Sequence, residues 1–93
     1  MYLHLGQNVV VPGALVVGIF DLDNTTGSKI TKEFLSMAEK AGRIVSVSDE
    51  LPNSFIVCDE GAPRGAGQPD ITIYLSQLSS QTLLKRFETM RFE

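Results

Sequence analysis

The sequence predicts an α+β fold in which a mostly antiparallel sheet of about six strands is combined with two helices. The apolar residues fall into short runs of strand length and into two longer segments with helical spacing. Residues that favour turns separate most of these segments. The predicted order is β-β-β-α-β-β-β-α, and a chain of 93 residues fits one small domain, residues 1–93.

The first two strands are short. Residues 2–5 are predicted as the first strand, with Tyr2 and His4 on one face because side chains alternate along a strand. A tight turn follows. Residues 8–11 are predicted as the second strand, which ends before Pro12.

The third strand is predicted at residues 15–21 and is apolar on both faces until Asp21. That pattern is typical of a strand buried on both sides. Two helices can cover only one face of a six-stranded sheet, so an apolar surface is left over. We therefore expect self-association as a symmetric homo-oligomer. The expected interface residues are Val16, Val17, Ile19 and Phe20.

The first helix is predicted to begin near Ser28, which is a suitable N-cap, with Thr26 as the alternative. One apolar stripe at helical spacing is expected to face the core. Gly42 lies where a left-handed C-cap is needed. The stripe consists of Ile30, Phe34, Met37, Ala38 and Ala41.

The second half of the chain continues with strands at residues 44–47, 54–58 and 71–75. Residues 60–70 are rich in Gly, Pro and Ala, and we expect a flexible insertion there. The second helix is predicted from Ser79 or Ser80 onward. Its buried residues are predicted to be Leu83, Leu84, Phe87 and Met90.

The composition predicts a folded domain, because 43% of the residues are hydrophobic and 20% are charged. No apolar run approaches the ~20 residues of a membrane-spanning helix. The start of the chain has no basic segment, so no secretory signal is predicted, and we expect a cytoplasmic location. Cys58 is the one cysteine and is expected to be a small buried hydrophobe. One Cys and the one His cannot close a zinc site without carboxylates, and no cofactor is predicted.

An apolar strand that leads into Asp21-x-Asp23 resembles the first motif of the haloacid dehalogenase phosphatases. That resemblance would make Asp21 the nucleophile and Asp23 the general acid–base, with a magnesium ion. Phosphoryl transfer needs several preorganised parts, including a remote lysine and a late acidic pair. The chain shows only the first motif. The sequence therefore favours a strand end followed by a turn that caps a helix, and no enzyme is predicted.

The charge balance disfavours a large nucleic-acid interface, since 8 basic and 11 acidic residues give a net charge of −3. Local basic clusters are nevertheless present. The sequence favours solvated helix faces over DNA contacts for these clusters. The candidate DNA-binding residues are Lys29, Lys32, Arg43, Lys85 and Arg86.

Several collinear segments together resemble the RemA/RemB family of small bacterial extracellular matrix (biofilm) regulators, and the RemB branch in particular. The resemblance covers nearly the whole chain outside the expected insertion. The segments are Met1-Tyr2-Leu3-His4-Leu5-Gly6, Val9-Val10-Val11, Gly18-Ile19-Phe20-Asp21, Leu51-Pro52-x-Ser54-Phe55-Ile56-Val57 and Ile73-Tyr74-Leu75-Ser76-Gln77-Leu78-Ser79-Ser80-x-Thr82-Leu83-Leu84-Lys85-Arg86.

The resemblance implies a ring-forming, cytoplasmic, non-enzymatic regulator. For the RemA branch it implies DNA binding through arginines before the third strand and in the hairpin after the first helix. Here these two places read Pro12-Gly13-Ala14-Leu15 and Ser48-Asp49-Glu50-Leu51-Pro52-Asn53. Neither carries a basic residue, so no DNA contact of that branch transfers to this chain.

Three functions remain open from the sequence. The first is a regulatory homo-oligomeric ring that associates with duplex DNA. The second is a homo-oligomeric protein-interaction module that acts on a related regulator protein without DNA. The third is a magnesium-dependent phosphotransfer enzyme that uses Asp21 and Asp23. None of them requires a membrane.

Overall fold

The structure, a computed structural model, describes residues 2–22, 29–60 and 70–90. The order of its strands and long helices confirms the predicted α+β arrangement. Of the expected insertion, only Glu60 and Asp70 belong to the described residues. Asp23 lies outside the described residues. The elements are β1 (Tyr2–Gly6), β2 (Val9–Pro12), the 3-10 helix η1 (Gly13–Leu15), β3 (Val16–Asp21), α2 (Lys29–Lys40), β4 (Ile44–Ser46), β5 (Ser54–Asp59), β6 (Ile71–Ser76) and α3 (Ser80–Met90).

The strands do not form one sheet, which corrects the prediction of a single six-stranded sheet. β1 and β2 form an antiparallel hairpin, and the other four strands form a sheet with the order β3-β5-β6-β4. β5 is antiparallel to β3 and β6, whereas β4 is parallel to β6. Pairing is therefore mostly antiparallel, as predicted. The hairpin is separate because Pro12 offers no backbone N–H and η1 then turns the chain away.

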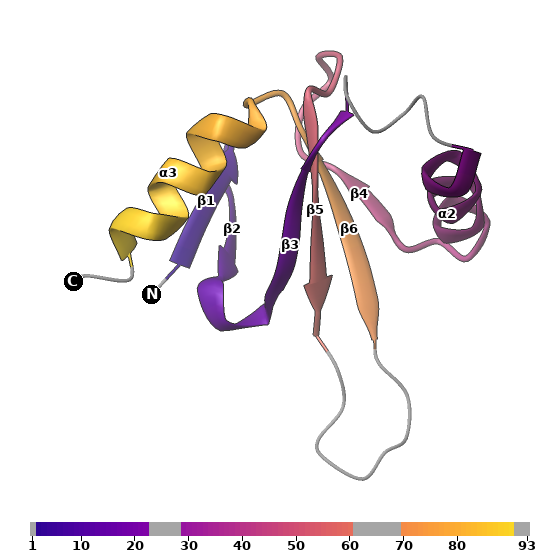
Figure 1. Cartoon of the computed structure of the whole chain (residues 1–93), viewed down its shortest axis with the longest axis horizontal. Helices are drawn as coiled ribbons and strands as arrows, with labels where there is room; N and C mark the ends of the chain where they lie inside the picture. The colour runs from indigo at the N-terminus through magenta and orange to yellow at the C-terminus, as the bar shows by residue number, and fades with distance from the viewer. Residues whose placement is uncertain (1, 23–28, 61–69, 91–93) are drawn as a thin grey trace, which may run out of the picture.

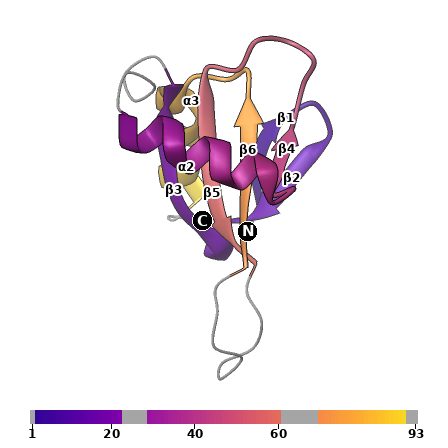
Figure 2. The same ribbon diagram turned by 90° about the vertical axis from the view of Figure 1, so that its right-hand side faces the viewer.

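The elements form three layers, with the sheet in the middle (Figure 1). The hairpin and α3 cover one face of the sheet, and α2 crosses the other face (Figure 2). The sequence had predicted both helices on one face, and that prediction is wrong because the hairpin forms part of a covering layer instead of extending the sheet. Side chains of β5 alternate between two cores: Ile56 and Cys58 face the hairpin and α3, and Phe55 and Val57 face α2.

β5 is the strand buried on both sides, and β3 is not, which corrects the prediction for residues 15–21. β3 lies at the edge of the sheet, and a β-bulge beside Val17 leaves that side chain 65% exposed. Phe20 stacks on Phe55 with ring centroids 5.0 Å apart. Its ring covers Gly18, where an added Cβ would come within 2.7 Å of it.

The helix ends follow the sequence prediction where they are described. The Ser79 hydroxyl accepts a hydrogen bond from the Thr82 N–H at 3.1 Å and caps α3. Gly42 has φ +71° after α2, and the Arg43 N–H donates to the Ala38 carbonyl at 2.9 Å, which closes the helix. The expected caps of α2, Ser28 and Thr26, lie outside the described residues.

The buried faces of the helices differ from the predicted ones. α2 packs on the sheet through Leu35 and Ala38, while Met37 is 71% exposed. A shift of one residue rotates a helical stripe by ~100°, so the predicted α2 stripe faces partly to solvent. α3 buries Leu83 fully, but Leu84 is 43% exposed and does not belong to the core.

Candidate functional site

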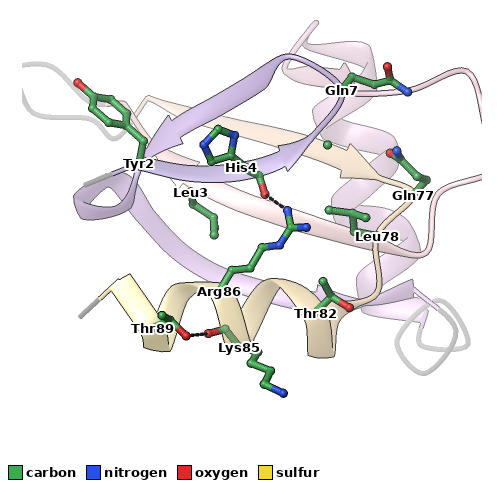
Figure 3. Close-up of a pocket in the computed structure, with 11 residues that line it drawn as sticks. Tyr2, Leu3, His4, Gln7, Gln77, Leu78, Thr82, Lys85, Arg86 and Thr89 are labelled. Carbon is green, nitrogen blue, oxygen red and sulfur yellow. Dashed lines mark hydrogen bonds between the residues drawn. The ribbon is translucent and has the colours of Figure 1, made fainter. Parts of the chain in front are cut away.

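A groove of about 910 Å³ runs between α3 and β1 (Figure 3). α3 supplies one wall, β1 and the turn after it supply the other, and the segment between β6 and α3 closes one end. We call it the basic groove. The residues that line it are Tyr2, Leu3, His4, Gly6, Gln7, Gln77, Leu78, Thr82, Lys85, Arg86 and Thr89.

The helical wall of the basic groove is a polar stripe of Thr82, Lys85, Arg86 and Thr89. These positions are i, i+3, i+4 and i+7, so they share one face of α3 and extend over roughly 10 Å. The stripe lies beside the buried face of the helix, where Leu83 is held in the core, and so borders the groove toward β1. The amphipathic pattern of α3 thus places two cations and two hydroxyls along one line.

The strand wall follows from alternation along β1. Tyr2 and His4 share one face of β1, as predicted, and Leu3 and Leu5 share the other. Leu3 and Leu5 are fully buried, whereas Tyr2 and His4 are exposed. Gly6 has φ +119°, and an added Cβ there would lie 3.1 Å from the Gln77 Oε1. A glycine is therefore required at this turn for its backbone angle and for the close approach of the amide.

Arg86 links the two walls of the basic groove. Its Nη1 donates a hydrogen bond to the His4 carbonyl oxygen at 3.3 Å, which Figure 3 shows as a dashed line. Lys85 lies at the outer rim of the groove, and its side chain points away from β1. None of the described lining residues is Asp or Glu. The groove is therefore a positively charged surface suited to contact with anions.

Lys85 and Arg86 are the two predicted site residues that the fold brings together. Lys32 is exposed on α2, on the other side of the sheet, and Lys29 begins that helix. Arg43 is engaged, because its Nη1 pairs with Asp70 at 2.8 Å and donates to the Ile71 carbonyl at 3.1 Å. The five candidate DNA-binding residues thus do not form a single surface.

A second, smaller hollow of about 410 Å³ adjoins the groove at Gln7, which lines both. It is bordered by the start of the loop formed by residues 48–53, which we call the acidic loop. Asp49 and Glu50 are exposed there, and Leu51 is 88% exposed. The Glu50 N–H donates to the Ser48 hydroxyl at 3.1 Å, which shapes the turn.

The remaining chemical candidates are not arranged as a catalytic site in the described residues. Cys58 is fully buried, as predicted, and burial raises the pKa of its thiol to about 11, with Glu60 adding to the shift. Asp21 ends the edge strand β3, and its predicted partner Asp23 lies outside the described residues. No group of three or more potential metal ligands occurs in residues 2–22, 29–60 and 70–90.

Sequence reasoning found only part of the basic groove. The four-residue stripe on α3 was visible as a helical pattern, although only its two cations had been selected. Tyr2 and His4 were missed as groove residues because no local signal connects β1 with a helix about eighty residues later. Gln77 was missed for the same reason: its position beside Gly6 depends on the fold of the whole chain.

Comparison with known proteins decides the family. No family model matches the chain. The chain is 36% identical to Extracellular matrix regulatory protein B of Bacillus subtilis (strain 168) over 90 residues, which are 97% of this chain and 94% of the relative. The chain belongs to the extracellular matrix regulatory protein B family. The resemblance to the RemB branch is therefore confirmed.

The chain therefore belongs to a family of bacterial regulatory proteins. The alignment covers nearly all of both chains, so it includes the elements that form the basic groove. Among the described residues, no helix is long and apolar enough to cross a membrane.

Proposed function

We propose that this protein is a non-enzymatic regulator of extracellular matrix genes that works as a homo-oligomeric ring and associates with duplex DNA. The regulatory role rests on the family. The DNA association rests on the basic groove, where Lys85 and Arg86 stand together without a carboxylate among the described lining residues. Contacts to phosphate dominate the affinity of proteins for DNA, and a ring repeats each contact on every subunit.

Self-association is supported by apolar side chains that the fold leaves in solvent. Val17 on β3 and Met37 on α2 are both more exposed than buried, and Phe20 is exposed on the α2 side of the sheet. Of the predicted interface, Val16 and Ile19 pack against the core, so Val17 and Phe20 are the two that can reach a partner. Exposed apolar groups of this kind are typical of protein interfaces.

The test of DNA association is fluorescence anisotropy with a labelled duplex of mixed sequence, at low and then moderate salt. We expect binding at low salt that weakens steeply as salt rises. Lys85→Glu should weaken binding, because one phosphate contact is lost. The slope of the logarithm of the binding constant against the logarithm of the salt concentration should become shallower by about 1. Lys40→Glu, an exposed change of the same charge on α2, should have a much smaller effect. A duplex that stays free at low salt would exclude the DNA association.

The second candidate is a homo-oligomeric module that regulates through a related regulator protein without DNA. The acidic loop and the net charge of −3 favour it, because they oppose binding to phosphate. It predicts no anisotropy change with DNA at any salt concentration. It also predicts that a related regulator protein, added in purified form, co-sediments with this one.

A further inference from the structure

The basic groove and the acidic loop are two surfaces of opposite charge whose hollows adjoin at Gln7, which lines both. One surface carries Lys85 and Arg86, and the other carries Asp49 and Glu50. Such a juxtaposition brings opposite charges close in space while leaving both surfaces open to solvent. Each surface is therefore available for contact with a partner of opposite charge.

The acidic loop is held in a fixed position. At its start, the buried Val47 donates its N–H to the Leu75 carbonyl at 2.9 Å. At its end, the Asn53 N–H donates to the Ser76 carbonyl at 2.8 Å, and the Asn53 Nδ2 donates to the Gln77 carbonyl at 2.7 Å. The loop therefore projects from two anchored ends.

The charges of the two surfaces are not neutralised within one chain. Asp49, Glu50, Lys85 and Arg86 form no ion pair with another described residue, and the pair of Arg43 and Asp70 lies away from both surfaces. Leu51 at the loop tip is 88% exposed, the most exposed large hydrophobic side chain of the described residues. An apolar tip preceded by two carboxylates is complementary to a groove that holds Arg86 between its walls and Lys85 at its outer rim, beside the side chains of Tyr2 and Leu78.

We infer that the acidic loop of one copy docks in the basic groove of a second copy. This inference deepens the self-association of the proposed function and rests on it. Asp49 and Glu50 would lie against Lys85 and Arg86, and Leu51 would be covered by the groove. Exposed ion pairs contribute little singly, so the contact needs the burial of Leu51 as well as the charges.

The adjoining positions of the two surfaces favour a reciprocal contact. Two copies related by a two-fold axis close to Gln7 can place both loops in both grooves at once, which is the usual form of a self-complementary interface. Such a contact closes at two copies, so it would pair subunits of two rings and would not itself form the ring. Each pair then makes the contact twice, and the second docking event is intramolecular.

Charge reversal tests this contact by sedimentation velocity at low salt. Asp49→Lys with Glu50→Lys reverses the charge of the acidic loop, and Lys85→Glu with Arg86→Glu reverses the charge of the basic groove. Each double variant should shift the assembly to a smaller species and weaken association by at least about tenfold. An equimolar mixture of the two should regain the wild-type species. The variant with all four changes should regain it alone, at the unchanged net charge of −3.

Glu39→Lys, an exposed change on α2 that lies ~200° around the helix from Met37, is the control and should sediment as the wild type. Reversed variants that keep the wild-type assembly would overturn the docking contact and leave the ring proposal standing. Failure of both the mixture and the fourfold variant to regain the assembly would also overturn it. A wild type that is monomeric at all concentrations would overturn both the contact and the proposed self-association.

Discussion

The thiol of Cys58 is a group whose protonation is linked to folding. It lies on the central strand β5 and is fully buried, and burial is the main cause that raises its pKa from 9.0 to about 11, with Glu60 adding to the shift. A reactive cysteine is a thiolate near neutral pH, and this one is not. The residue therefore belongs to the packing of the fold and not to chemistry at the surface.

Stability should fall as pH rises from 9 toward 11. Well below pH 9 the thiol is protonated in both states. As the pH rises through 9, the unfolded chain loses the proton first, so unfolding becomes more favourable. Urea unfolding at pH 8, 9 and 10 measures this. Tyr74, whose pKa is raised from 10.0 to about 12 by burial and its hydrogen bond to Glu60, contributes little up to pH 10. Cys58→Ala should make the free energy of unfolding depend less on pH. The same pH dependence in the wild type and in Cys58→Ala would contradict the linkage.

At the scale of the element, α3 offers two adjacent leucines with opposite environments. Leu83 is fully buried in the core with the hairpin, whereas Leu84 is 43% exposed. Leu83→Ala should lower the free energy of unfolding by about 2–5 kcal/mol, because it leaves a cavity. Leu84→Ala should cost about 1 kcal/mol or less. Urea unfolding followed by circular dichroism gives both values, and similar losses would mean that α3 packs through another face.

Most elements could be predicted from local patterns, because alternation, helical spacing and caps such as Ser79 and Gly42 are properties of neighbouring residues. Their arrangement could not. β3 and β5 are both apolar on two faces, and only pairing between distant strands decides that β5 is central and β3 is at the edge. The basic groove was likewise only partly predictable. Lys85 and Arg86 are neighbours in sequence, but the β1 wall opposite them comes from the far end of the chain.

At the scale of the whole molecule, one pair of cations serves two proposed partners. A DNA phosphate and a carboxylate of the acidic loop would both contact Lys85 and Arg86, and they cannot do so at once. Self-pairing through the basic groove and DNA association are then mutually exclusive at this face. A protein with a net charge of −3 could thereby keep its basic surface covered until DNA displaces the loop.

Neutralising the loop should therefore strengthen DNA binding. Asp49→Asn with Glu50→Gln removes the competing carboxylates without adding positive charge. If about nine-tenths of the grooves hold a loop, freeing them tightens the apparent Kd about tenfold. Fluorescence anisotropy with the labelled duplex at low salt measures the change. Glu33→Gln with Glu39→Gln changes the net charge equally on α2 and corrects for general electrostatics. Equal affinities of these two variants would show that the loop does not compete with DNA for the groove.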